Sequence, residues 1–210
     1  MTGSTAAPGT GSIRAFVGLG ANVGDARATL RAAVAALAGL PGTHVAAVSR
    51  LYRTAPVGVV DQPDFLNAVV ALDRDPGSDD DATGALRLLV QLKDLERDFG
   101  RRQRRRWGPR ELDLDLLLFG DARLALERPP EGVPLSAAVD PKAAARLLEV
   151  PHPSMASRLF VLAPLADLAP QLTPPGWSES VARRAASVAA AEPGAVTPLG
   201  SWDSARSDWR

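Results

Sequence analysis

The pattern of hydrophobic and polar positions divides residues 13–119 into alternating strand-like and helix-like segments. Short apolar runs bounded by Gly, Pro or polar residues predict strands, and apolar residues spaced three and four apart predict helices. The expected strands are residues 13–19, 45–53, 65–72 and 111–119, and the expected helices are residues 25–40 and 81–99. The order is therefore strand, helix, strand, strand, helix, strand.

This order is the split βαβ arrangement of ferredoxin-like folds. It predicts an α+β two-layer sandwich in which helices pack on a mainly antiparallel sheet. We expect one domain over residues 13–198. A flexible tail is predicted at residues 1–12 and a frayed tail at residues 199–210.

The second half of the chain has a weaker pattern. Residues 127–149 are Pro-rich and then Ala-rich, which predicts an insertion with a short helix at residues 141–148. Further helices are expected at residues 160–166 and 178–191.

Composition narrows the classes of function. The chain has 24 basic and 24 acidic residues and no net charge, which disfavours a polybasic nucleic-acid binder. It has no cysteine, which excludes disulfides, thiolate metal sites and Cys nucleophiles. Because the sequence contains neither a long apolar stretch nor a signal-like start, we expect no membrane span and a cytoplasmic location.

Two carboxylates alternate with leucines in the last of the four strands. Asp113 and Asp115 lie two residues apart, so their side chains share one face with Cα atoms about 6–7 Å apart. Like charges this close repel unless a cation lies between them. Mg²⁺, which binds carboxylates together with substrate phosphates, is the natural partner. The alternative is a solvated polar face on an edge strand.

An arginine-rich segment precedes the carboxylates. Seven arginines fall between Arg97 and Arg110, and guanidinium groups bind phosphate oxygens in pairs. Cations beside a carboxylate pair favour a Mg–nucleoside triphosphate site. A nucleic-acid patch would explain the arginines and Trp107, but the aspartates would repel its phosphate backbone.

A stiff, Pro-containing loop at residues 54–64 leads into the third strand. Phe65 and Asn67 follow on one face, and an aromatic ring beside an amide suits a flat, hydrogen-bonding heterocycle. The alternative is a core Phe65 and a turn Asn67.

Two further features carry less information. His152 is either a loop residue or a hydrogen-bond donor to phosphate, and Arg158 and Phe160 again pair a cation with an aromatic ring. The glycine-rich turn at residues 18–25 lacks the Gly-Lys-Ser/Thr of a Walker loop, so we expect a tight strand-to-helix turn.

Four ordered motifs together resemble the 6-hydroxymethyl-7,8-dihydropterin pyrophosphokinase family of folate biosynthesis. They lie within residues 13–170: Gly20-Ala21-Asn22; Thr54 to Asn67 with Asp61-Gln62-Pro63; Trp107-Gly108-Pro109-Arg110 to Asp115; and Pro151-His152 followed by Arg158 and Phe160. The resemblance implies transfer of an intact diphosphate from ATP to the hydroxymethyl group of the pterin, leaving AMP.

The resemblance also implies roles for individual residues. Two Mg²⁺ ions are expected on Asp113 and Asp115, with Arg101 and Arg110 as the catalytic arginines. The pterin-binding residues would be Thr54, Pro56, Val57, Phe65, Asn67, Trp107 and Phe160. The ATP-binding residues would be Glu96, Arg101, Arg110, His152 and Arg158. We expect small-molecule substrates, no nucleic acid or membrane partner, and a monomer or weak dimer.

Some positions depart from the family pattern. Gln103 stands where the family usually has the second arginine of Arg-x-Arg, Ala21 replaces a serine, and Phe65 replaces a tyrosine. An active pyrophosphokinase is the main hypothesis. A pterin- or nucleotide-binding protein without catalysis is the alternative, which Gln103 favours and the intact aspartates disfavour.

Overall fold

The computed structural model describes residues 11–56, 61–100, 108–129 and 145–210. The first elements are β1 (Ile13–Ala21), α1 (Ala26–Ala38), β2 (Thr43–Val48), β3 (Leu51–Thr54), β4 (Phe65–Arg74), α2 (Asp81–Asp98) and β5 (Asp113–Phe119). In the described part, the main sheet has the order β5-β1-β4-β3-β8, and β2 also pairs with β4. All its pairings are antiparallel, so the predicted α+β class with a mainly antiparallel sheet is confirmed.

The predicted strand at residues 45–53 is two strands. Both pair with β4, β2 along its second half and β3 along its first. Ser49 separates them, because its N–H donates to the Val69 carbonyl at 2.9 Å and its hydroxyl accepts from the Val69 N–H at 2.9 Å. A side chain that competes for backbone partners in this way interrupts a strand.

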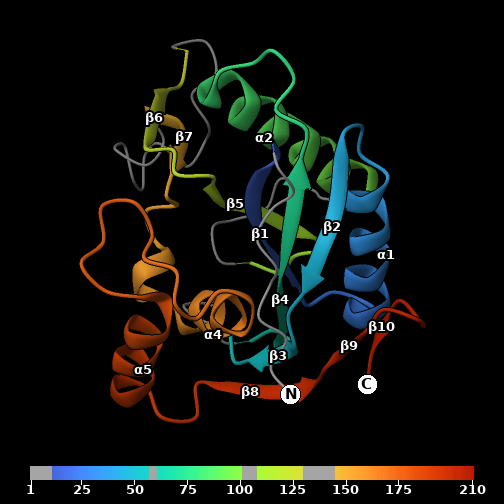
Figure 1. Cartoon of the computed structure of the whole chain (residues 1–210). Coiled ribbons are helices and arrows are strands. Elements are labelled where there is room, and N and C mark those ends of the chain that lie inside the picture. Colours follow the sequence, from blue (N-terminus) through green and yellow to red (C-terminus); the bar gives the residue numbers. More distant parts are fainter. Residues whose placement is uncertain (1–10, 57–60, 101–107, 130–144) are drawn as a thin grey trace.

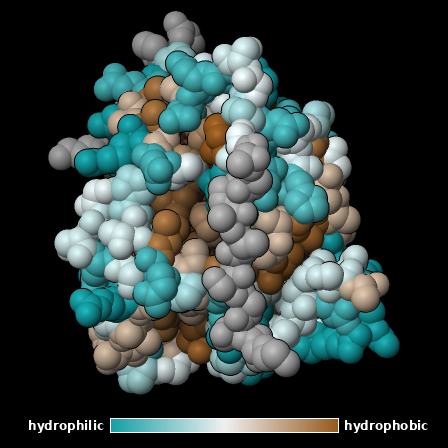
Figure 2. Space-filling view, in the orientation of Figure 1, coloured by the Kyte–Doolittle hydropathy of each residue, from teal (hydrophilic) through white to brown (hydrophobic). Residues whose placement is uncertain are grey.

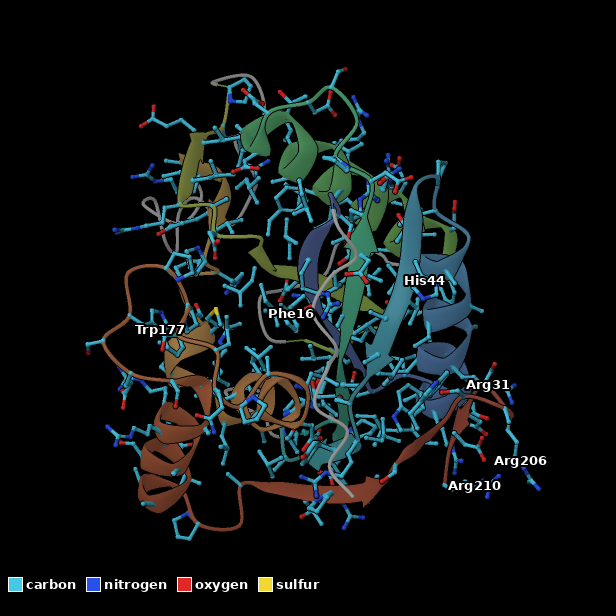
Figure 3. All side chains as sticks on the ribbon, viewed as in Figure 1. Phe16, Arg31, His44, Trp177, Arg206 and Arg210 are labelled. Carbon is cyan, nitrogen blue, oxygen red and sulfur yellow. The ribbon has the colours of Figure 1, made fainter. Side chains whose placement is uncertain are left out.

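Each face of the sheet buries its own hydrophobic cluster. Helices α1 and α2 cover one face through Leu30, Leu37 and Leu92. On the other face lie α4 (Leu159–Leu168) and α5 (Val181–Ala191), where Phe16 points toward α4 (Figures 1 and 3). The predicted helices at residues 160–166 and 178–191 correspond to α4 and α5. They add a second helical layer to the expected sandwich.

Figure 2 views the molecule in the same orientation as Figure 1. Hydrophobic residues gather near the centre of this view, and hydrophilic residues line much of its margin. Among the described residues, no helix is long and apolar enough to span a bilayer.

The segment predicted as an insertion begins and ends in paired strands. β6 (Leu124–Glu127) is antiparallel to β7 (Arg146–Val150). The predicted helix at residues 141–148 is therefore wrong at residues 146–148, and residues 141–144 lie outside the described residues. The strand forms because Leu148 and Val150 alternate into the core, where they are 5% and 2% exposed.

The expected frayed tail is also corrected. β8 (Val196–Gly200) pairs with β3, and β9 (Trp202–Asp203) forms a hairpin with β10 (Asp208–Trp209) beside α1 (Figure 1). Trp209 is 1% exposed, and its indole N–H donates to the Ser49 carbonyl at 2.9 Å. Burial of this large side chain provides the free energy that orders the segment.

Arginines surround the C-terminal hairpin. Arg31, Arg206 and Arg210 lie near one another in the view of Figure 3, where α1 meets the hairpin. Asp208 pairs with Arg27 at 3.3 Å and with Arg31 at 3.9 Å, which ties the hairpin to α1. These exposed pairs add little stability, so the buried tryptophan dominates this contact.

Candidate active site

The candidate site lies at one end of the sheet, on the face that carries α4. Gly20 is the Cα partner of Asn67 on one side and of Asp113 on the other. Gly18 is in turn the partner of Asp115. Two strand positions without side chains therefore lie beside the two carboxylates, and they leave room above the sheet for a ligand.

The two carboxylates have the predicted geometry. Along β5, Asp113 and Asp115 are half-buried, whereas the intervening Leu114 is fully buried in the core against the opposite helices. The side chain of Asp115 is 37% exposed. The pair therefore remains accessible to solvent and to a ligand.

The donor set suits one kind of metal. Among the described residues, no three His, Cys, Asp or Glu side chains gather as a closed metal cage. Two adjacent carboxylates fit Mg²⁺, which binds through one or two carboxylates and takes its other ligands from substrate phosphates and water. They do not fit a structural metal with an all-protein coordination shell.

Asn22 connects three of the sequence motifs. It is 3% exposed, and its side-chain oxygen accepts from the Arg110 N–H at 2.8 Å. Its Nδ2 donates to Gln62 Oε1 at 3.0 Å and to the Pro63 carbonyl at 2.9 Å. The sequence named Asn22 within the glycine-rich turn and its motif but gave it no role of its own, and the structure shows that it holds Arg110 against the proline loop.

The predicted pterin residues are partly assembled. Asn67 is 6% exposed, and its Nδ2 donates to Thr54 Oγ1 at 2.8 Å. A Cβ atom on Gly20 would lie 3.2 Å from Asn67 Oδ1, so the glycine makes this placement of the amide possible. Phe65 is half-buried two residues before Asn67 and therefore lies on the same face.

His152 lies beside β5. Its backbone N–H donates to the Leu117 carbonyl at 2.9 Å, at an irregularity in the pairing of β5 with β1. Its Nδ1 accepts from the Ser154 N–H at 3.2 Å, which leaves Nε2 as the N–H donor of the neutral ring. Burial lowers the pKa of His152, and the negative charge of Asp115 partly offsets that effect.

The beginning of α4 contributes the last pair of predicted residues. The Arg158 guanidinium lies 5.7 Å from the centre of the Phe160 ring, within cation–π range. Both residues are half-buried, and Phe160 packs against the cluster under α4. An aromatic ring and a cation are thus placed on the same side of the sheet as Phe65.

Two side chains of α2 contact β5 at Leu114, between the two aspartates. Glu96 is 2% exposed, and its Oε1 accepts from the Leu114 N–H at 2.7 Å. Lys93 Nζ donates to the Leu114 carbonyl at 2.8 Å and to Glu96 Oε1 at 2.8 Å. The nucleotide contact expected for Glu96 stays a prediction. Sequence reasoning assigned Lys93 no role, although its spacing from Glu96 places both on one helix face.

Four residues of the expected site lie outside the described residues: Val57, Arg101, Gln103 and Trp107. Pro56 and Arg110 are described, and both are half-buried.

In this fold a carboxylate pair, an arginine that precedes it and a separate aromatic–amide surface are the groups expected of a nucleotide-dependent transferase. The chain belongs to the 7,8-dihydro-6-hydroxymethylpterin-pyrophosphokinase (HPPK) family, whose model matches residues 16–170. The predicted family is therefore confirmed, and the chain is an ATP-dependent diphosphotransferase of folate biosynthesis.

Individual relatives agree with this assignment. The chain is 43% identical over 162 residues to a pyrophosphokinase of Pseudomonas aeruginosa, with 77% of this chain and 84% of the relative covered. It is 37% identical over 158 residues to one of Bacillus subtilis, with 75% and 79% covered. Both relatives are named 2-amino-4-hydroxy-6-hydroxymethyldihydropteridine pyrophosphokinase.

A solved structure supports the fold. An HPPK-DHPS crystal structure in complex with substrates superposes with a TM-score of 0.66 at 14% identity. The match covers 91% of this chain and 47% of that longer chain. At this identity the similarity concerns the fold alone.

Proposed function

We propose that this site transfers an intact diphosphate from ATP to the hydroxymethyl group of 6-hydroxymethyl-7,8-dihydropterin, giving the pterin diphosphate and AMP. One observation supports the proposal most directly: Asn67 on β4 and Asp113 on β5 flank Gly20, which lies on β1 between these two strands. The amide that would bind the pterin and a carboxylate on the phosphate side therefore lie on either side of one glycine. The acceptor hydroxyl would lie between them.

The pterin would bind on the Asn67 side. Asn67 and Thr54 are already oriented by their own hydrogen bond, so the amide can bind the edge of the ring without reorganisation. Phe65 and Phe160 would stack on the two ring faces. Pro56 and Val57 would contribute loop contacts, and Trp107 would cover the ring and exclude water.

Mg²⁺ would bind at Asp113 and Asp115, with two ions as the proposed number. When bound, the cation would neutralise negative charge on the triphosphate during the transfer. The two carboxylates would orient the triphosphate toward the pterin. Their partial exposure leaves room for phosphate oxygens to complete the coordination.

The remaining charged residues would contact the phosphates. Asn22 binds both the backbone N–H and the backbone carbonyl of Arg110. Arg110 and Arg101 would together stabilise negative charge on the transferred group. His152 would donate its Nε2 N–H, and Arg158 would add a second cation. The pterin oxygen bonds to the β-phosphorus as that atom's bond to the α,β-bridging oxygen breaks, and the hydroxyl proton passes to solvent.

The setting follows from the same assignment. We propose a monomer or weak dimer in the cytoplasm that acts on small molecules rather than nucleic acid. The domain would begin near residue 13 and include the C-terminal strands, because β8 extends the main sheet.

A product assay tests the proposal. The protein is mixed with ATP, Mg²⁺ and the pterin, and AMP and ADP are followed together. AMP that appears in step with pterin diphosphate is expected, whereas ADP would contradict diphosphate transfer. Saturable pterin binding without turnover would favour a non-catalytic binder.

Two variants connect the assay to the site. Asp115→Ala is expected to lower kcat by about a thousandfold or more with the fold retained. Asp121→Asn removes an exposed carboxylate from the turn after β5 and is the control, expected to match wild type. Turnover of Asp115→Ala within about tenfold of wild type would contradict the metal role.

A further inference from the structure

Among the described strands, β5 lies at the edge of the main sheet and pairs with β1 on one side. At Leu114 two helix side chains take the place of the missing neighbour. Glu96 accepts from the Leu114 N–H at 2.7 Å, and Lys93 donates to the Leu114 carbonyl at 2.8 Å. The donor and acceptor of one residue are thus both satisfied from α2, as a paired strand would satisfy them.

From this arrangement we infer that Lys93 and Glu96 are positioning residues that hold Asp113 and Asp115 in the geometry that binds the cation. The inference rests on the proposed function, since it concerns the same carboxylate pair. Leu114 lies directly between the aspartates. Fixing its peptide groups fixes the strand direction from which both carboxylates project.

The position of the ammonium group supports this inference. We call the pair formed by Lys93 and Glu96 the clamp. Lys93 Nζ lies 2.8 Å from Glu96 Oε1 and 4.0 Å from Asp115 Oδ1, so the clamp contacts one of the two carboxylates directly. The Glu96 side chain is 2% exposed and that of Lys93 is 39% exposed. The carboxylate is therefore anchored in the protein, and the ammonium lies at the boundary with the site.

The electrostatic balance explains why a cation near the proposed metal is tolerated. The positive charge of Lys93 is directly paired with the negative charge of Glu96, so the pair as a whole is neutral. A neutral pair exerts a weaker field at Asp115 than a lone ammonium would. The contribution of the clamp to cation binding is therefore geometric, and displacements of about 1 Å at such a site are costly.

A competing explanation is that the pair only packs α2 against the sheet. In that case its removal would lower the stability of the protein and leave cation binding unchanged in the folded molecules. Removing Lys93 alone cannot separate the two explanations, because it leaves a buried carboxylate without its cation.

The double variant Lys93→Met/Glu96→Gln separates them. It removes one positive and one negative charge together, and the amide oxygen introduced by Glu96→Gln can still accept from Leu114. The measurements are the melting temperature, kcat and KM for the pterin. The dissociation constant for Mn²⁺ is measured by electron paramagnetic resonance with a non-hydrolysable ATP analogue.

We expect a melting temperature close to wild type, Mn²⁺ binding weakened by about tenfold, and kcat lowered by about ten- to a hundredfold. KM for the pterin is expected to change by less than about threefold, since the clamp lies on the phosphate side. Arg87→Met is the matched control: it removes an ion-paired cation from the same helix, 2.7 Å from Asp79, and should match wild type.

Mn²⁺ affinity within about twofold of wild type in the folded double variant would overturn the inference. If that variant does not fold, Lys93→Gln/Glu96→Gln takes its place, because it also removes both charges together and its two amides can still donate to and accept from Leu114. Intermediate Mn²⁺ affinity is then expected, and wild-type affinity would overturn the inference. Failure of the wild-type protein to form AMP would instead contradict the proposed function.

Discussion

Asn22 and Arg110 are joined by two hydrogen bonds although 88 residues separate them. The Asn22 N–H donates to the Arg110 carbonyl at 3.0 Å, and the Arg110 N–H donates to Asn22 Oδ1 at 2.8 Å. The Nδ2 group of Asn22 also donates one hydrogen bond to Gln62 and one to Pro63. One buried side chain therefore sets the spacing between the loops that would bind pterin and phosphate.

Replacing Asn22 by Ala should loosen that spacing. We expect kcat/KM to fall by about thirty- to a hundredfold, because small displacements at a reacting site are costly. The free energy of unfolding should fall by about 1–3 kcal/mol, since buried hydrogen-bond partners lose Asn22. Steady-state kinetics and urea denaturation measure the two effects.

Gln62→Ala is the control for this prediction. It removes one acceptor of the Asn22 amide and leaves the 2.9 Å bond to the Pro63 carbonyl. Its kcat/KM should stay within about threefold of wild type. Wild-type kinetics in Asn22→Ala would show that Asn22 does not position the catalytic segment.

The glycines of β1 provide a second test. In Gly20→Ala the new Cβ would lie 3.2 Å from Asn67 Oδ1, so the amide must shift by a few tenths of an ångström, which strains its bond with Thr54. We expect the dissociation constant for the pterin to rise by about tenfold, or about 1.4 kcal/mol. Fluorescence titration with the pterin measures it.

Gly18→Ala is matched to that variant. Its Cβ would lie 3.6 Å from the Leu117 side chain, which is an ordinary contact. Its pterin affinity should stay close to wild type. Equal losses of affinity in the two variants would mean that general strain in β1, rather than the Asn67 contact, is responsible.

The local features of this site were predictable from the sequence. Asp113 and Asp115 share a face because side chains alternate along any strand, so two residues suffice for the inference. The order of strands and helices likewise follows from local periodicity. Four motifs in order were sufficient to indicate the family that the comparisons confirm.

The features that depend on long-range contacts were not predictable. In the sequence Lys93 is one polar position of a helix. Only the structure shows that its ammonium lies 2.8 Å from the Leu114 carbonyl, 21 residues away. Trp209 is an apolar residue in a short polar segment until it packs near Ser49. In both cases the partner is set by tertiary packing, which overrides local propensity.

Trp209 is therefore expected to matter for stability rather than for turnover. Trp209→Ala should lower the free energy of unfolding by about 3–5 kcal/mol, the usual cost of removing a buried aromatic side chain. Trp209→Phe keeps most of the apolar area but loses the 2.9 Å bond to Ser49, so it should cost less. Denaturant unfolding gives both values.

The expected kinetic result follows from where Trp209 lies. It belongs to the cluster on the α1 face of the sheet, and the candidate site lies on the α4 face. At a temperature where both variants stay folded, kcat and KM should match wild type. A specific loss of kcat in Trp209→Phe would contradict this separation.

Tyr52 is the single tyrosine of the chain, so its ionisation can be followed without interference from another tyrosine. It is 4% exposed, and its hydroxyl donates to the Asp167 carboxylate at 2.9 Å. Burial raises the pKa of Tyr52 well above its ordinary value, and the negative charge of Asp167 raises it further. The folded protein therefore holds this proton at pH values where the unfolded chain has lost it.

The sign of the pH dependence follows from that difference. Above the unfolded pKa of about 10, the native state binds more protons than the unfolded state, so stability falls as pH rises. Absorbance titration should show tyrosinate only as the protein unfolds. In Asp167→Asn the removal of the negative charge should lower the pKa of Tyr52, whereas burial keeps it above the ordinary value. Tyrosinate formation near pH ~10 in a folded wild-type protein would contradict the buried position of Tyr52.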